Sequence, residues 1–382
     1  MSTENIEESM TTLDVVIVGA GPAGIGMALA LSKVPGLAFG VLESDRIGES
    51  FRRWPAQTRL ITPSFNSNPF GLADLNAVDE TSSPAIFAGS EHLSGPQYAD
   101  YLNSVADAHD LPIACGCKVL EVHADPERGF VMATEKGELH TQFLIWATGE
   151  YQFPDLNPFP GARSCLHYAQ IEDWQALEGN HHTVIGGYES GIDAAVNLLR
   201  LGHRVRLLAR RKTWDLPDVD DPSEVLSPYT RERLRELEQT GRLELVFGAD
   251  VVQVSPKEAG GFRVQAADGR HWDSGTRPVL GTGFVSGGGA QQIADLWEWD
   301  EEGHIVLTPE DESTRAPGLF LVGSQVRHQQ RIYCFIYKFR QRFALIATEL
   351  AQRLELDDFG LIAPGGAWGP FGNDECCEGC EC

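Results

Sequence analysis

Basic side chains are scarce in this sequence compared with acidic ones. Among its 382 residues, 30 are lysine or arginine and 55 are aspartate or glutamate, which gives a formal net charge of -25. A surface field of that sign repels phosphate backbones and anionic lipid headgroups, so the composition argues against nucleic acid and membranes as partners. The first residues, MSTENIEESM, lack the basic and apolar regions of a secretory signal, which favours a cytoplasmic protein.

Long apolar runs and long charged blocks are also rare. One apolar run, VVIVGAGPAGIGMALALSKV, approaches the roughly 20 residues of a membrane span, but its glycines and Pro22 fit a strand, a turn and a helix better. Charged residues are mixed through the chain, so disorder is expected only at the ends. We expect a disordered N-terminus in residues 1–12 and a flexible, cysteine-rich tail in residues 353–382, with two globular domains between them.

The apolar run begins a dinucleotide-binding pattern. VVIV is typical of a buried parallel strand, and AGIGMALALSKV is typical of an apolar helix. Gly19, Gly21 and Gly24 lie between them in GxGxxG spacing, which permits the turn, the approach of a pyrophosphate to backbone N–H groups, and close packing of helix and strand. Glu43 ends the next strand, at the position that binds a ribose hydroxyl. Together these features predict a bound dinucleotide.

A second unit of the same kind occurs in VIGGYESGIDAAVNLLRLGHRVRLLARR. Its turn runs from Gly186 to Gly191 and includes Ser190, but Tyr188 replaces the middle glycine, which could hold a pyrophosphate farther away. Where the first unit has Glu43, this one has a basic cluster: Arg210, Arg211 and Lys212. Guanidinium groups accept a 2′-phosphate, so the second site favours NADPH; the alternative is a solvated basic strand end.

Small residues follow several later strands. FLIWATGEY carries Thr148 and Gly149, and RPVLGTGF carries Gly283; such segments pass between domains beside bound nucleotides. The stretches CKVLEVHADPERGFVMATEKGELHTQ and SPKEAGGFRVQAADGRHWDSG both show the short alternating strands of a small antiparallel meander that joins its parent sheet. After Gly318 the sequence predicts a strand, a glycine turn at Gly323 and one long amphipathic helix that returns to the first domain.

These features together resemble the two-dinucleotide-binding flavoproteins, a superfamily that includes thioredoxin reductases and flavin-dependent monooxygenases, over roughly residues 13–352. Finer details are similar to the bacillithiol disulfide reductase family: VLESDRIGESFRRWP, LSGPQYADYLNSVADAHDLPI, VIGGYESGIDAA and RIYCFIYKFRQRF. In that family, too, the second fingerprint lacks its middle glycine. The resemblance implies an α/β fold with two Rossmann-like domains, in which an NADPH domain (156–283) is inserted into an FAD domain (13–155 and 284–352) and each carries a small antiparallel β-meander.

The resemblance also assigns the cofactors to residues. It implies FAD on the first glycine turn and Glu43, NADPH on the second turn and Arg210, and hydride transfer from the nicotinamide to the flavin. The predicted cofactor contacts are Gly19, Gly21, Gly24, Glu43, Val119, Thr148, Gly149, Gly186, Ser190, Gly191, Arg210, Arg211, Gly283 and Gly323. Fold similarity does not identify the final electron acceptor.

A cysteine pair is missing from the places where a disulfide reductase usually has one. No pair follows Glu43, and the segment before the second fingerprint offers only Cys165, which is interpreted as a buried residue. Cys115 and Cys117 alternate along a predicted strand and are also interpreted as buried. Cys334 is expected in the first turn of the last helix, together with Arg327 and His328. There the helix dipole would lower the pKa of the thiol beside the flavin, although a packed core cysteine is the alternative.

The tail NDECCEGCEC carries four cysteines: Cys376, Cys377, Cys380 and Cys382. The C-x-x-C pair of Cys377 and Cys380 could take electrons from the flavin and carry them outward. Alternatively, the four thiolates could bind a soft metal such as Zn(II), Cu(I) or Hg(II), or the tail could have no direct role in turnover. The neighbouring glutamates would raise the pKa values of these thiols, which argues mildly against a reactive thiolate.

The leading hypothesis is an FAD-dependent enzyme that passes electrons from NADPH to a disulfide of a small thiol or redox protein, with Cys334, Cys377 and Cys380 as candidate catalytic residues. A flavin-dependent monooxygenase is the first alternative, because of GESFRRWP and the missing cysteine pair. A soft-metal-binding flavoprotein sensor or carrier is the second. Whether the chain forms a homo-oligomer is left open.

Overall fold

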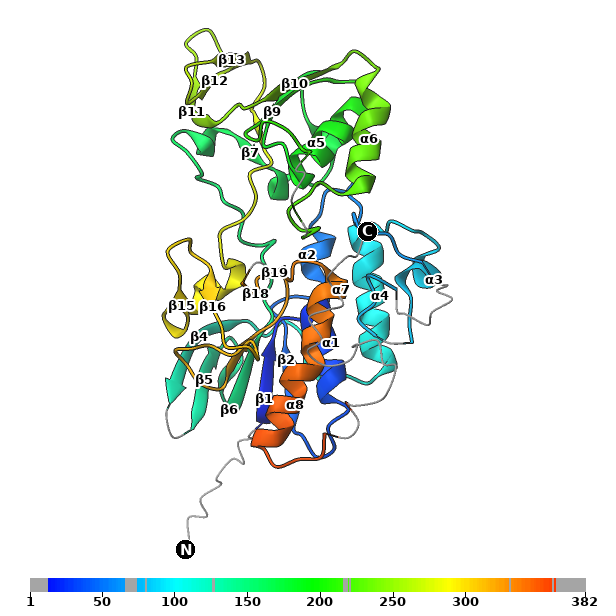
Figure 1. Cartoon of the computed structure of the whole chain (residues 1–382), viewed down its shortest axis with the longest axis vertical. Helices are drawn as coiled ribbons and strands as arrows, with labels where there is room; N and C mark the ends of the chain where they lie inside the picture. The colour runs from blue at the N-terminus through cyan, green and yellow to red at the C-terminus, as the bar shows by residue number, and fades with distance from the viewer. Residues whose placement is uncertain are drawn as a thin grey trace, which may run out of the picture.

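The chain folds into two lobes, each built on its own β-sheet (Figure 1). The computed structural model describes residues 13–65, 74–79, 81–125, 128–215, 219, 221–329, 331–358 and 361. The predicted disordered residues 1–12 lie outside this description, and so do residues 362–382 of the predicted tail. We call the lobe that contains strand β1 (Leu13–Val18) the first lobe, and the lobe that contains β8 (His181–Ile185) the second lobe.

A seven-stranded sheet forms the first lobe, in the order β3-β2-β1-β6-β5-β4, with β17 paired to β6. The other strands are β2 (Phe39–Leu42), β3 (Ile113–Ala114), β4 (Val119–Asp125), β5 (Gly129–Thr134), β6 (Gly137–Trp146) and β17 (Leu319–Leu321). The strands around β1 are parallel, whereas β4, β5 and the start of β6 are antiparallel. The first predicted meander is therefore continuous with its parent sheet.

Six helices belong to the described part of the first lobe: α1 (Pro22–Leu31), α2 (Glu49–Arg52), α3 (Pro84–Ala88), α4 (Gly95–Ala108), α7 (Ile336–Phe339) and α8 (Phe343–Arg353). Helix α1 is apolar on all sides, which is typical of a helix that is buried all round. It packs on β1 and β2 and against α4 and α8. Helix α4 begins with a capping box, in which Ser94 and Gln97 satisfy each other's backbone N–H groups.

The main sheet of the second lobe is entirely parallel, in the order β10-β9-β8-β14-β7. Its other strands are β7 (Leu166–His167), β9 (Arg204–Ala209), β10 (Leu243–Phe247) and β14 (Val279–Leu280). Helix α5 (Glu189–Arg200) packs on this sheet, and α6 (Pro228–Glu238) lies against α5. The second predicted meander is a separate three-stranded antiparallel sheet of β11 (Val251–Pro256), β12 (Phe262–Ala266) and β13 (His271–Ser274), at the far end of this lobe (Figure 1).

Shorter elements complete the described chain. Two small hairpins are β15 (Glu298–Trp299) with β16 (Ile305–Val306), and β18 (Arg327–His328) with β19 (Arg331–Ile332). Single 3-10 turns occur at Ala162–Ser164, Tyr168–Gln170, Trp174–Ala176 and Arg340–Arg342, and a longer 3-10 segment with a kink at Ile293 spans Gly288–Leu296. None of the described helices is long and apolar enough to cross a membrane.

The segment after Gly318 differs from its prediction in one respect. Strand β17 and the return to the first sheet are as expected, but the β18–β19 hairpin stands between β17 and the helix. The backbone conformation of Gln329 accounts for the difference. Its φ of 53° turns the chain back on itself before the helix can begin. Helical structure starts only at Ile336, with Phe335 as the extended N-cap residue. The prediction that Cys334 lies in the first helical turn is therefore wrong.

Two parallel sheets with helices packed against them confirm the predicted α/β class. The chain leaves the first sheet after β6, builds the second lobe and comes back with β17. This path agrees with an inserted second module. The domain boundaries 13–155, 156–283 and 284–352 stay predictions.

The contact between α8 and α1 generates a stability prediction. Phe343 is fully buried, and its ring lies where a β-carbon on Gly26 would be, 2.2 Å from Cε2. We expect Phe343→Ala to lower the free energy of unfolding by about 3 to 5 kcal/mol, because it leaves a cavity between the two helices. Urea unfolding followed by circular dichroism measures the change. The matched control is Phe87→Ala, since Phe87 is 47% exposed; equal losses in both variants would contradict the packing argument.

Candidate functional site

A cavity lies where residues of the two lobes meet. It has a volume of about 430 Å³ and is lined by both glycine turns, by the ATG motif after β6 (residues 147–149) and by parts of the chain after β17. The predicted contacts that line it are Gly19, Gly21, Glu43, Thr148, Gly149, Ser190, Gly323 and Cys334. One cavity therefore brings together residues from both fingerprints and a thiol.

The first glycine turn is shaped by backbone packing. Gly19 has a φ of 106°, and a β-carbon there would lie 2.5 Å from the carbonyl oxygen of Ala147. A β-carbon on Gly24 would lie 1.9 Å from the carbonyl oxygen of Gly19. By contrast, a β-carbon on Gly21 would meet no atom within 4 Å, because this glycine faces the cavity. The open approach at Gly21, at the N-terminus of α1, fits a pyrophosphate held by backbone N–H groups.

Glu43 follows β2 and is held beside this turn. One carboxylate oxygen accepts a hydrogen bond from the Ala20 N–H at 2.8 Å, and the other accepts one from the Asp45 N–H at 2.9 Å. The side chain is buried and lines the cavity. Its position at the end of the second strand is the one that a ribose-binding carboxylate takes in this kind of fold.

Thr148 supplies a further test of whether the site fits FAD. Its hydroxyl oxygen is buried and has no hydrogen-bond partner in the described structure, although buried polar groups are normally paired. Thr148 and Gly149 follow β6 and line the cavity, and Gly323 lines it from the end of β17. The Thr148 hydroxyl lies against Gly289 and not in the cavity, so the fit to a dinucleotide rests on the open glycine at position 21 and the fixed carboxylate of Glu43. These residues could hold FAD.

The second glycine turn repeats the first with one change. Gly186 has a φ of 114°, and a β-carbon on Gly191 would lie 1.8 Å from its carbonyl oxygen. Tyr188 stands where the first turn has Gly21, as the N-cap residue of α5. Its hydroxyl donates to the carbonyl oxygens of Ser223 at 3.0 Å and Val225 at 2.7 Å. The tyrosine side chain is thereby directed toward the 223–225 loop, and it lines the cavity together with Ser190.

The basic residues after β9 are exposed, outside the cavity lining. Arg211 donates to the carbonyl oxygen of Glu224 at 2.8 Å, and its guanidinium lies 5.0 Å from the centre of the Tyr188 ring. Arg210 has no hydrogen-bond or ion-pair partner in the described part of the chain. Five other predicted contacts also lie outside the cavity lining: Gly24, Val119, Gly186, Gly191 and Gly283. Val119 begins β4 and pairs with Thr134, and Gly283 accepts a hydrogen bond from His167. Their cofactor roles stay predictions.

Cys334 lies in the cavity wall, two residues before α7. Burial raises the pKa of its thiol, while a hydrogen bond with Ser223 and the charge of Lys338 act in the opposite direction. The expected lowering of this pKa by a helix dipole is therefore wrong, because Cys334 precedes the helix and the helix itself has only one turn before the 3-10 segment. Arg327 and His328, expected in the same turn, lie on β18, where His328 hydrogen-bonds Asp311.

Sequence reasoning missed Glu150, which lines the cavity next to Gly149. Burial raises the pKa of its carboxyl group, against the opposing effects of Arg327 and a hydrogen bond from Gln325. Gln325 is itself fixed, since its side-chain oxygen accepts the Gly287 N–H at 2.9 Å. The sequence signal that could have identified Glu150 was its position directly after the ATG motif. A carboxyl group with a raised pKa in a cavity is a candidate proton donor or acceptor.

The other described cysteines lie away from the cavity. Cys165 is buried as predicted, and burial raises the pKa of its thiol to about 12. Cys117 is buried but Cys115 is exposed, because β3 ends at Ala114 and Gly116 turns the chain with a φ of 60°. The interpretation of Cys115 as buried is therefore wrong. Cys376, Cys377, Cys380 and Cys382 lie outside the described residues, so their predicted redox and metal roles stay predictions.

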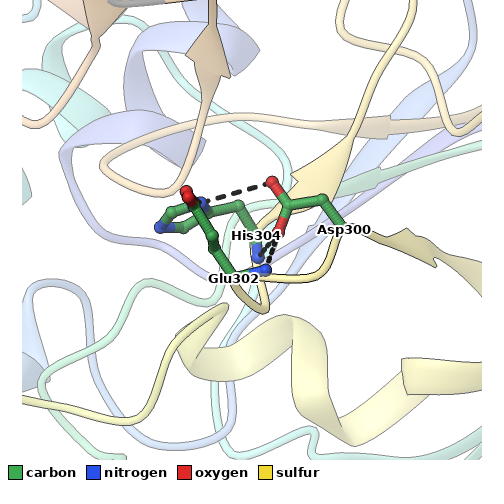
Figure 2. Close-up of side chains that lie close together, drawn as sticks. All are labelled: Asp300, Glu302 and His304. Atoms are coloured by element: carbon green, nitrogen blue, oxygen red, sulfur yellow. Dashed lines mark hydrogen bonds and ion pairs between the residues drawn. The ribbon is translucent and has the colours of Figure 1, made fainter.

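One described group has the composition of a metal site. Figure 2 shows Asp300, Glu302 and His304 gathered at the turn between β15 and β16. The Asp300 carboxylate accepts the backbone N–H groups of Glu302 at 2.9 Å and His304 at 2.8 Å, and these bonds lower its pKa. Two of the side chains are exposed. The hydrogen bonds of an acidic turn account for this arrangement without an ion.

Comparison with known proteins agrees with this geometry. The sequence profile of the family described as pyridine nucleotide-disulphide oxidoreductase matches residues 16–323. Bacilliredoxin reductase Bdr of Bacillus subtilis is 23% identical over 352 residues, which cover 88% of this chain and 97% of that protein. Bacillithiol disulfide reductase Bdr from Staphylococcus aureus superposes with a TM-score of 0.72 at 20% identity, over 90% of this chain and 99% of that one.

A flavin-containing monooxygenase from Stenotrophomonas maltophilia also superposes, with a TM-score of 0.69 at 17% identity, over 90% of this chain and 100% of that one. These similarities confirm the predicted fold and the predicted resemblance to both groups of flavoproteins. The family match supports FAD and NADPH as the cofactors.

The burial of Cys334 predicts its reactivity. Because its pKa is raised, we expect alkylation by iodoacetamide to keep accelerating with pH beyond about 8.5, the ordinary pKa of a cysteine thiol. Peptide mass spectrometry resolves Cys334 from the other cysteines, and N-acetylcysteine in the same buffers provides the reference. A rate for Cys334 that is already constant below pH 8 would show a lowered pKa instead.

Proposed function

The chain belongs to the pyridine nucleotide-disulphide oxidoreductase family, and from this premise we propose that it uses NADPH, through bound FAD, to reduce a disulfide of a small thiol or redox protein. The balanced reaction consumes one NADPH, one proton and one disulfide, and yields NADP⁺ and two thiols. FAD, when bound, supplies a two-electron relay between the nicotinamide and the disulfide.

One observation carries the proposal: both glycine turns and Cys334 line a single cavity. Gly21 leaves space for a pyrophosphate at the first turn, and Ser190 lines the cavity from the second turn. A flavin and a nicotinamide held by these turns would approach each other in that space. Cys334 and Glu150 would then lie beside them, as a thiol and a proton-holding carboxyl group.

The substrate class comes from the named relatives. The Bacillus subtilis protein is named a bacilliredoxin reductase, and the Staphylococcus aureus protein a bacillithiol disulfide reductase. One name denotes a redox protein and the other the disulfide of a small thiol. We therefore carry these two kinds of disulfide to this chain as the proposed acceptors.

A monooxygenase is the second candidate, and one observation favours it. Among the described residues, Cys334 is the sole cysteine that lines the cavity, so no described thiol pair stands ready to exchange with a disulfide. The tail pair Cys377 and Cys380 could complete the relay, but these residues lie outside the described structure. The soft-metal sensor hypothesis rests on the same tail cysteines. Oxygen consumption separates a monooxygenase from a disulfide reductase.

The choice of NADPH over NADH predicts the effect of one arginine. Arg210 is exposed after β9 with no described partner, so its guanidinium is available to a 2′-phosphate. We expect Arg210→Ala to raise the KM for NADPH about tenfold or more, with little change in the KM for NADH, because a charge-assisted hydrogen bond is lost only with NADPH. Steady-state NAD(P)H oxidation measures both constants.

Arg204→Ala is the matched control, since Arg204 is exposed at the opposite end of the same strand. It should leave both constants unchanged. An equal rise for NADPH and NADH in Arg210→Ala would contradict 2′-phosphate recognition.

Anaerobic mixing with NADPH tests the electron path. We expect the flavin absorbance of the full chain to bleach and then to recover when bacillithiol disulfide or an oxidised redox protein is added. A version that ends at Asp374 should bleach equally well but recover slowly if the tail cysteines carry the electrons. Equal recovery in both versions would remove the tail from the path. Recovery only after oxygen is admitted, with no response to disulfides, would favour the monooxygenase.

A further inference from the structure

A second cavity lies between the lobes on the side of α5 and α6, and Arg59 is the one residue that lines both it and the nucleotide cavity. Its volume is about 320 Å³. The first lobe contributes Gln57 and Arg59, from the chain after α2, and the second lobe contributes four residues: Asn197 and Arg200 at the end of α5, and Tyr229 and Arg233 on α6. Both lobes therefore form its walls.

The charge of this second cavity is opposite to that of the protein. Three of its lining residues are arginines, and no carboxylate belongs to the described lining, although the whole chain carries a net charge of -25. Four acids stand just outside it. Asp173 accepts a hydrogen bond from the Gln57 side chain at 2.6 Å, and the charge of Arg233 acts on the nearby Glu189. Asp193 pairs with Arg233 at 2.7 Å, and Glu236 approaches Arg200 at 3.7 Å. Arg59 has no carboxylate partner among the described residues, because its guanidinium donates to the carbonyl oxygens of Ala56 at 2.9 Å and Thr58 at 2.8 Å. Guanidinium groups around one cavity repel each other unless an anion joins them.

One N–H group of Arg233 also lacks a hydrogen-bond acceptor. Its side chain is only 5% exposed, yet its Nε–H has no partner in the described structure. Its guanidinium lies 4.3 Å from the centre of the Tyr229 ring, which stacks on His92 with ring centres 3.6 Å apart. A buried guanidinium N–H is normally satisfied, so the unpaired Nε–H leaves Arg233 short of one acceptor beside the cavity.

We propose that this second cavity binds a small oxyanion, the phosphate or carboxylate group of a metabolite, between Arg59, Arg200 and Arg233. Guanidinium groups match both kinds of oxyanion with paired hydrogen bonds. Because the arginines come from both lobes, the anion ties the lobes together. A ligand that binds only the assembled pair of lobes stabilises that arrangement by mass action.

The test uses the FAD-loaded full chain, with sodium phosphate as the probe and sodium chloride at equal ionic strength as the reference. Isothermal titration calorimetry measures phosphate affinity, and thermal unfolding followed by circular dichroism measures Tm. Arg200→Gln is the informative variant, because Arg200 is half-exposed and lines the second cavity but not the nucleotide cavity. We expect it to weaken phosphate binding about tenfold and to abolish the rise in Tm.

Two control variants keep the result specific. Arg210→Gln removes the predicted 2′-phosphate contact and should leave the response intact, as should Arg315→Gln, an exposed arginine on the first lobe. A sodium succinate arm, at equal ionic strength, distinguishes a carboxylate ligand from a phosphate ligand. An unchanged response in Arg200→Gln, a response lost in Arg210→Gln, or no saturable effect of either anion would overturn the proposal.

Discussion

The contact on which both lobes depend is one of backbone against backbone at the glycine turns. In the first lobe, Gly24 at the start of α1 packs on the carbonyl of Gly19, and Gly19 packs on the carbonyl of Ala147. No side chain fits at these distances, so a larger residue would push the helix away from the strand. Helix α1 could not then present its N-terminus to the cavity. The cofactor site therefore rests on a packing constraint before it rests on any polar contact.

The second lobe repeats this contact, which shows that the two modules share one local design. Gly191 packs on the carbonyl of Gly186 as Gly24 packs on Gly19, and Gly186 faces the backbone of Gly281 as Gly19 faces Ala147. The repetition ends at the middle position. At this middle position a β-carbon causes no steric clash, because a β-carbon on Gly21 would meet no atom within 4 Å. The fold therefore tolerates Tyr188 at the equivalent position. What the tyrosine alters is the approach of a ligand to the turn.

Much of this arrangement was predictable from sequence, because it follows from local pattern. Strand, glycine turn and helix are specified within about thirty residues, and GxGxxG spacing has a geometric cause. The start of the last helix was not predictable in the same way. Its apolar period continues upstream through RIYCF, but the positive φ at Gln329 folds that stretch into a hairpin. Cys334 consequently lies in an extended segment, where burial rather than a helix dipole sets its pKa.

Contacts between residues that lie far apart in the chain could not be predicted from the sequence either. Asp193 on α5 accepts hydrogen bonds from Thr58 of the first lobe at 2.9 Å and from Tyr168 at 2.7 Å. Nearby, Lys338 of α7 binds Asp221 and Ser223 of the second lobe. Ser223 connects two residues of the candidate site. Its carbonyl oxygen accepts the hydrogen bond from Tyr188, and its side chain hydrogen-bonds the Cys334 thiol. The surroundings of the thiol therefore depend on the same loop that holds the Tyr188 hydroxyl, at the one position where the second turn departs from the first.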